Sequence, residues 1–208
     1  MRALTGSDVY VADRLFATLD TTVRALEPPT RPRILVSDTV GFIRKLPHGL
    51  VASFKSTLDE ALEASLILQM VDASDPAYPR QMQATDEVLR DIGAGEVPRR
   101  VVFNKIDRIA DPAAVALLTD GRPDALAISS KRPEDVARVR QALIDFFERN
   151  FVDAELTLGY HRQALRAELF ERCQVVSEHS DERGTTFQLR GAAEEIERLR
   201  ALVGRHDA

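Results

Sequence analysis

The sequence predicts an α/β fold with a parallel sheet over residues 1–150 and a small α+β domain over residues 151–208. Two observations carry this prediction. In the first part, short apolar runs alternate with longer helical patterns, which is typical of a parallel sheet flanked by helices. After about residue 150 the order changes to strand, helix, strand, strand and helix. We therefore expect two domains.

Four apolar runs are the expected strands of the first domain. They are RILVS (33–37), LILQMVD (66–72), RRVVFN (99–104) and ALAIS (125–129). Helical patterns lie at about residues 49–64, 78–92, 112–119 and 133–150. An acid, Asn or Ser stands at the carboxyl end of each strand. Because open α/β sheets bind ligands at those ends, we expect the functional site there.

The second domain has five expected elements in the order β-α-β-β-α. They are ELTLGY (155–160), RQALRAELFERC (162–173), QVVSEHS (174–180), TTFQLR (185–190) and AAEEIERLRALV (192–203). A turn at DERG (181–184) joins the second strand to the third. Cys173 lies in the helical pattern of this domain, and we interpret it as a small buried hydrophobe.

The composition excludes several classes of protein. Hydrophobic residues make up 44% and charged residues 29% of the chain, as in a globular protein. The net charge of −5 gives no overall attraction to nucleic acid, so we expect no DNA binding and only local contact with RNA. One cysteine excludes a disulfide framework, and no apolar run approaches the roughly 18 residues of a membrane span. We expect a cytoplasmic monomer without an integral membrane segment.

Four short motifs follow one another along the first domain. They are LFATLD (15–20), DTVG (38–41), NKID (104–107) and SSK (129–131). Each motif alone is weak, because such short patterns recur by chance. Together, in this order and beside the ends of strands, they indicate a domain that binds a guanine nucleotide, GTP or GDP.

The third and fourth motifs suit recognition of the base. The carboxylate of Asp107 can accept hydrogen bonds from N1–H and the exocyclic amino group of guanine, a pattern that adenine does not offer. Asn104 would brace the loop and the stem of Lys105 would cover one face of the ring. Backbone N–H groups of the SSK motif would reach the O6 atom of guanine.

The first two motifs suit the phosphates and a Mg²⁺ ion. Asp38 would hold the ion through a water molecule, and the amide of Gly41 would meet the γ-phosphate with no side chain in the way. Thr18 would bind the ion through its hydroxyl and the γ-phosphate through its N–H. The simpler alternatives are turn residues at Asn104 and Asp107, a solvated Thr18, and a helix-capping turn from Asp38 to Gly41. Each of these simpler alternatives is favoured when its motif is considered alone. They are disfavoured when all four motifs occur together in this order.

At these residues the chain resembles the HflX family of ribosome-associated GTPases. The resemblance rests on ALTGSDVYVADRLFATLDTT, DTVGFIRKLPHGLVASFKSTLDEA, MVDASDP and NKID, and it extends over the terminal β-α-β-β-α domain. It implies a three-layer G domain of the P-loop NTPase type. It also implies nucleotide contacts by Phe16, Ala17, Thr18, Leu19, Asp20, Asp38, Thr39, Val40, Gly41, Phe42, Asn104, Lys105, Ile106, Asp107, Ser129, Ser130 and Lys131, with Thr18 as a ligand of Mg²⁺.

The sequence departs from the GTPase pattern in two places. Phe42 stands where small GTPases usually carry a glutamine that orients the attacking water, so we expect slow intrinsic hydrolysis and no certain catalytic residue. None of the ten glycines is followed by lysine, so no GxxxxGK[ST] phosphate loop is present. We expect a G domain without its first strand and phosphate loop, and therefore a chain that is inactive alone. The strands at 33–37 and 66–72 would flank the absent strand.

Two classes of function remain open. The resemblance implies a GTPase that binds the large ribosomal subunit and its rRNA, and that couples GTP hydrolysis to ribosome binding or splitting. The alternative is a non-enzymatic module that binds the ribosome or another partner. Arg44, Lys45 and His48 could touch rRNA phosphates in either case, although three cations on a loop are more often solvated. An ATPase or dinucleotide enzyme is disfavoured, because NKID suits guanine and no GxGxxG is present.

Overall fold

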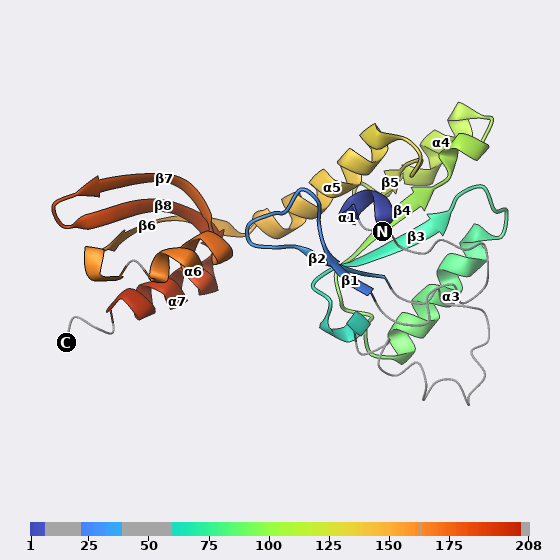
Figure 1. Ribbon diagram of the computed structural model, residues 1–208. Helices are drawn as coiled ribbons and strands as arrows, with labels where there is room; N and C mark the ends of the chain where they lie inside the picture. The colour runs from blue at the N-terminus through green and yellow to red at the C-terminus, as the bar shows by residue number, and fades with distance from the viewer. Residues whose placement is uncertain (7–21, 39–59, 163, 205–208) are drawn as a thin grey trace. The chain divides into compact units, whose positions relative to one another are not determined.

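The structure is a computed structural model that describes residues 1–6, 22–38, 60–162 and 164–204 (Figure 1). The described residues form two compact units. The first contains residues 1–3, 22–23, 37–38 and 60–139, and the second contains residues 4–6, 24–36, 140–162 and 164–204. This division falls inside helix α5 (Pro133–Glu148). A domain boundary at residue 150 stays a prediction.

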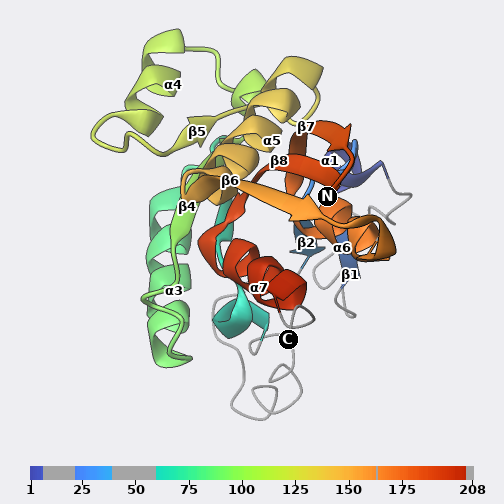
Figure 2. The ribbon, with the colours of Figure 1, turned by 90° about the vertical axis from the view of Figure 1, so that its left-hand side faces the viewer.

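A three-stranded parallel sheet forms the centre of the first unit. Its strands are β3 (Ile67–Asp72), β4 (Arg99–Asn104) and β5 (Leu126–Ala127), in the order β3-β4-β5. Helix α3 (Tyr78–Asp91) connects β3 to β4, and helix α4 (Pro112–Thr119) lies between β4 and β5 in the chain. Figures 1 and 2 show α3 and α5 on opposite sides of the sheet. The predicted α/β fold with a parallel sheet is confirmed.

The central strand explains why the run RRVVFN is apolar without alternation. Val102 and Phe103 are both fully buried, as expected for a strand with helices on both faces. Phe103 packs with Val71, Ala73 and Leu118, and its ring meets that of Tyr78 edge to face with centroids 5.8 Å apart. This packing fixes the ends of β3 and β4 side by side, with Asp72 opposite Asn104.

Strand β5 is shorter than the predicted run at 125–129. Its hydrogen bonding continues through Ile128, whose N–H donates to the carbonyl of Phe103 at 2.8 Å. The N–H of Ser129 then donates to the carboxylate of Asp135 at 2.8 Å instead of to a neighbouring strand. The chain therefore leaves the sheet at Ser129 because a side chain of α5 takes over its backbone donor.

Two further strands form a separate sheet. Strand β1 (Thr22–Ala25) pairs with β2 (Leu35–Asp38), and no described strand joins β2 to β3. The sequence predicted β2 but not β1. Leu35 on β2 and Met70 on β3 are 62% and 54% exposed. The expectation that the segments 33–37 and 66–72 flank an absent strand stays a prediction.

The second unit contains the predicted β-α-β-β-α order. Its strands β6 (Phe151–Leu158), β8 (Gly184–Ala192) and β7 (Gln174–Asp181) form an antiparallel sheet in that order. A 3₁₀ turn η2 (Tyr160–Arg162) precedes helix α6 (Leu165–Arg172), and helix α7 (Ala193–Gly204) ends the unit. Figure 1 shows both helices on one side of the sheet.

Buried and exposed residues alternate along strands β6 and β8, and the buried ones form much of the core of the second unit. From Ala154 to Leu158 every second residue of β6 is buried. The core consists of Ala154, Leu156, Leu158, Leu169, Cys173, Phe187, Leu189, Ile196 and Leu199. Cys173 is fully buried, and burial raises the pKa of its thiol. The interpretation of Cys173 as a small buried hydrophobe is confirmed. In the part of the chain that the structure describes, every helix is too short or too polar to traverse a lipid bilayer.

Gly184 starts β8 at a place where no side chain fits. Its φ is +151°, and a Cβ atom there would lie 2.2 Å from the carbonyl oxygen of Leu158. We expect Gly184→Ala to lower the free energy of unfolding by about 2–4 kcal/mol, because the clash is with backbone and cannot relax by a side-chain rotation. Urea unfolding measures this change. Gly204→Ala is the control, since nothing lies within 4 Å of its added Cβ. Equal stability of the two variants would show that a Cβ atom at position 184 does not clash with the Leu158 backbone.

Candidate functional site

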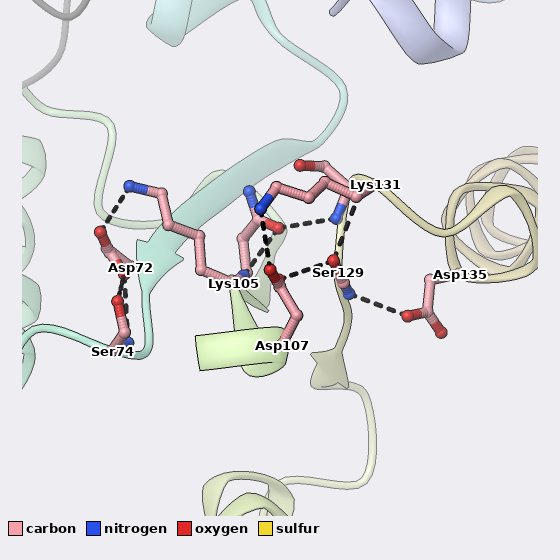
Figure 3. A network of polar contacts seen from close by, with 9 residues as sticks. Asp72, Ser74, Lys105, Asp107, Ser129, Lys131 and Asp135 are labelled. Atoms are coloured by element: carbon pink, nitrogen blue, oxygen red, sulfur yellow. Dashed lines mark hydrogen bonds and ion pairs between the residues drawn. The ribbon is translucent and has the colours of Figure 1, made fainter. Parts of the chain in front are cut away.

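The loops after β3, β4 and β5 meet at one edge of the parallel sheet (Figure 3). Asp72 ends β3, Asn104 ends β4, and Ser129 follows β5. The pairing of Asp72 with Asn104 in the register places the first two loops next to each other. The carboxyl edge of the sheet is thus where the described polar side chains gather, as the sequence predicted for strands of this kind.

Asn104 joins two of these loops through one oxygen atom. Its Oδ1 accepts the N–H of Lys105 at 2.8 Å and the N–H of Ser130 at 2.9 Å. Lys105 has φ 66° and ψ 30°, and it is the only residue other than glycine with a positive φ among those that the structure describes. That conformation costs roughly 1–2 kcal/mol, and the hydrogen bond that the Lys105 N–H donates to Asn104 offsets part of it. Asn104 therefore braces both loops.

Asp107 lies in a 3₁₀ turn η1 (Ile106–Arg108), and both of its carboxylate oxygens accept hydrogen bonds. Its Oδ1 accepts from the Ser129 hydroxyl at 2.7 Å, and its Oδ2 accepts from Lys131 Nζ at 3.1 Å. The Ser129 hydrogen bond first, and Lys131 second, lower the pKa of Asp107 to about 2. The carboxylate is therefore ionised at neutral pH. An ionised carboxylate offers about four lone-pair positions, so it can still accept two further N–H groups.

Asp135 fixes the third loop, and sequence reasoning missed it. Its Oδ2 accepts the N–H of Ser129, and its Oδ1 accepts from Arg138 Nη1 at 3.0 Å. Both Ser129 and Asp135 are buried. Their pairing holds Ser129 in place against Asp107. An acid in the first turn of a helix that directly follows a motif was the available indication of this role.

Asp72 is the second residue that the sequence did not single out. Its Oδ2 accepts from Lys105 Nζ at 2.6 Å, and its Oδ1 accepts from the N–H and hydroxyl of Ser74 at 3.1 and 2.6 Å. Partial burial acts to raise the pKa of Asp72, but the hydrogen bonds from Lys105 and Ser74 together lower it below its ordinary value. The acid at the end of the run LILQMVD was the available indication.

The structure thus brings together the predicted base-recognition residues, Asn104 to Asp107 and Ser129 to Lys131. The predicted phosphate end is different. Asp38 ends β2, whereas Phe16, Ala17, Thr18, Leu19, Asp20, Thr39, Val40, Gly41 and Phe42 lie outside the described residues, as do Arg44, Lys45 and His48. No group of three or more His, Cys, Asp or Glu side chains suited to a metal ion occurs in residues 1–6, 22–38, 60–162 and 164–204. The Mg²⁺ ligands stay a prediction.

Proteins named as GTPases are similar in sequence to this chain. The family described as 50S ribosome-binding GTPase matches residues 1–105. A protein named GTPase HflX from Gluconacetobacter diazotrophicus is 58% identical over 206 residues, which are 99% of this chain and 46% of that protein. The GTPase HflX of Caldanaerobacter subterraneus subsp. tengcongensis is 37% identical over 98% of this chain and 46% of its own length. The chain therefore spans about half the length of these curated relatives.

Comparison of structures gives the same class of fold. The crystal structure of a protein called SsGBP in complex with GDP aligns with 60% of this chain and 41% of its own chain, with a TM-score of 0.51 and 27% sequence identity. The mixed α/β fold with a parallel sheet is shared with this solved protein, which was crystallised with GDP.

Proposed function

Because this chain belongs to the 50S ribosome-binding GTPase family, and within it to the HflX GTPases, we propose that its loops at residues 104–107 and 129–131 bind the guanine base of GTP or GDP. The observation that supports this most is the ionised Asp107 carboxylate. Ser129 and Lys131 hold it in one orientation. A carboxylate fixed in this way is an acceptor for two N–H groups, and guanine presents two N–H groups on one edge.

The neighbouring groups suit the rest of the base. Asn104 holds the backbone of Lys105 and Ser130, and the N–H of Lys131, which has only a long 3.4 Å contact with Ser129 Oγ, can meet the O6 atom of guanine. Adenine carries an amino group at that position and would place a donor against a donor. Adenine also lacks the N1–H that Asp107 accepts. The loops would therefore select guanine by its O6 acceptor and by its N1–H and amino donors.

For the whole protein we propose a GTPase of the HflX type. It would associate with the large ribosomal subunit and its rRNA in the cytoplasm as a monomer, and couple GTP hydrolysis to ribosome binding or splitting. Asp38, through a water molecule, and Thr18 would hold Mg²⁺, for which carboxylate and hydroxyl oxygens are suitable ligands. Bound Mg²⁺ would neutralise phosphate charge. Phe42 cannot orient a water molecule, so the group that activates water must come from elsewhere.

Binding of single nucleotides tests the proposed base site directly. We expect GMP to shift the backbone amide NMR signals of Ile106, Ser130 and Lys131 with a Kd on the order of 1 mM, equivalent to about −4 kcal/mol. GMP has only one phosphate, so this affinity reports mainly on the base. AMP is the matched control and should leave these signals unchanged. Equal shifts with AMP and GMP, or shifts confined to other regions, would contradict guanine recognition.

We propose as a second candidate a non-enzymatic module that binds the ribosome. Within these 208 residues no glycine is followed by lysine, so the usual lysine that contacts the phosphates is not supplied by a GxxxxGK[ST] motif here. Co-sedimentation with large ribosomal subunits separates the candidates. Binding that is unchanged by GTP or GDP favours the module, whereas binding that depends on GTP favours the GTPase.

A further inference from the structure

Asp72 has a position in the site that the contacts proposed for the base do not explain. It ends β3, the strand next to the one that leads into the 104–107 loop. Its two oxygens have different partners, since Ser74 occupies Oδ1 with two hydrogen bonds and Lys105 Nζ occupies Oδ2. Ser74 therefore orients the carboxylate so that Oδ2 faces the lysine.

Lys105 stands between two carboxylates. Figure 3 shows its side chain extending from the loop towards Asp72, while Asp107 lies on the other side of the Lys105 backbone. The Lys105 side chain is 41% exposed, and its ammonium group pairs with the Asp72 carboxylate at 2.6 Å. Its backbone is fixed by Asn104 and its ammonium group by Asp72. Among the contacts that the structure shows, the ion pair with Asp72 is thus the one that directs the ammonium group away from Asp107.

Asp107 must remain open to its ligand if the proposed guanine site is correct. It already accepts from Lys131, and Lys105 is only two residues away in the chain. A hydrogen bond between an ammonium group and a carboxylate is stronger than one between the same carboxylate and a neutral N–H donor. A Lys105 ammonium group without a partner would therefore compete with guanine for the remaining lone pairs of Asp107.

We propose that Asp72 is a positioning residue for guanine recognition, which holds the ammonium group of Lys105 away from Asp107 and leaves only the apolar stem of Lys105 beside the base. This role rests on the proposed guanine site and acts through Lys105. Ser74 contributes by fixing the orientation of the Asp72 carboxylate. Selectivity for guanine thus depends on a third strand end as well as on the two loops that contact the base.

Variants at both members of the ion pair test this role. Asp72→Asn keeps the oxygen that accepts from Ser74 and loses the acceptor for Lys105, so we expect the Kd for GMP in the NMR titration to rise about tenfold. Lys105→Met removes the ammonium group and keeps an apolar stem, and we expect a rise of about threefold. The double variant should bind GMP like Lys105→Met alone. Recovery of binding by a second substitution is not expected if Asp72 serves only the stability of the fold.

Two further variants keep the test decisive. Asp86→Asn removes the carboxylate of another ion pair, with Arg99, outside the site, and should bind GMP like the unaltered chain. Ser74→Ala releases the orientation of Asp72, and should raise the Kd about threefold even if Asp72→Asn does not fold. The role of Asp72 is overturned if Asp72→Asn binds GMP normally, or if the double variant is as weak as Asp72→Asn. It is also overturned if Asp72→Asn cannot be folded and Ser74→Ala has no effect on GMP binding. Failure of the unaltered chain to prefer GMP over AMP would instead overturn the guanine site itself.

Discussion

Asp107→Asn is expected to change the preferred base from guanine to xanthine. The carboxamide has one acceptor and one donor group, and xanthine presents N1–H beside a carbonyl oxygen where guanine has its amino group. The side-chain oxygen can accept the N1–H while the amide group donates to the xanthine carbonyl. With guanine, the amide group would face the exocyclic amino group, donor against donor.

The expected effect of this substitution is large because it combines a lost and a repulsive contact. GMP binding should weaken by about 100-fold, which corresponds to about 2.7 kcal/mol, and fall below detection in the NMR titration. XMP should bind about as tightly to the variant as GMP binds to the unaltered chain. Lys131 supports the change, because its ammonium group cannot donate to an amide nitrogen and must leave Oδ2.

Asp111→Asn is the matched control for this experiment. Asp111 caps helix α4 by accepting the N–H of Ala113 at 2.9 Å, and asparagine caps helices about as well as aspartate. The control therefore removes one negative charge only four residues from Asp107 without changing the loop. Retained preference of Asp107→Asn for GMP over XMP would show that Asp107 does not read the base.

Asn104→Ala is expected to release the two loops from each other. It removes the oxygen that accepts from the N–H groups of Lys105 and Ser130, and it leaves Lys105 in a left-handed conformation without support. The free energy of unfolding should fall by about 1–2 kcal/mol. Amide hydrogen exchange at Lys105 and Ser130 should accelerate, and the preference for GMP over AMP should disappear.

Asn104→Asp separates the loss of the acceptor from the loss of the side chain. The carboxylate keeps an oxygen in the same place, so both N–H groups retain a partner and exchange should stay slow. The two variants are compared by urea unfolding and by hydrogen exchange followed residue by residue. Unchanged exchange at both amides in Asn104→Ala would mean that other contacts hold the loops.

The order of strands and helices in both units was predictable because it depends on local patterns. Apolar runs gave β3 and β4 to within a residue, and periodicity gave α3, α4 and α5. The predicted order of the second unit, strand, helix, strand, strand and helix, is also confirmed. Strand β1 has only four residues, and its pairing with β2 could not be inferred from so short a run.

The sequence by itself determined the α/β class, the order of most elements, the family and which residues are predicted to recognise the base, because hydrophobic periodicity and short motifs depend on residues that are neighbours in the chain. Only the tertiary structure decided which of these side chains meet. Asp72 binds a lysine 33 residues away, and Ser129 takes its backbone partner from α5 and gives its hydroxyl to Asp107, 22 residues earlier. Such contacts depend on parallel strands ending at one edge of a sheet, where the register, and not the spacing in the chain, sets which groups are close.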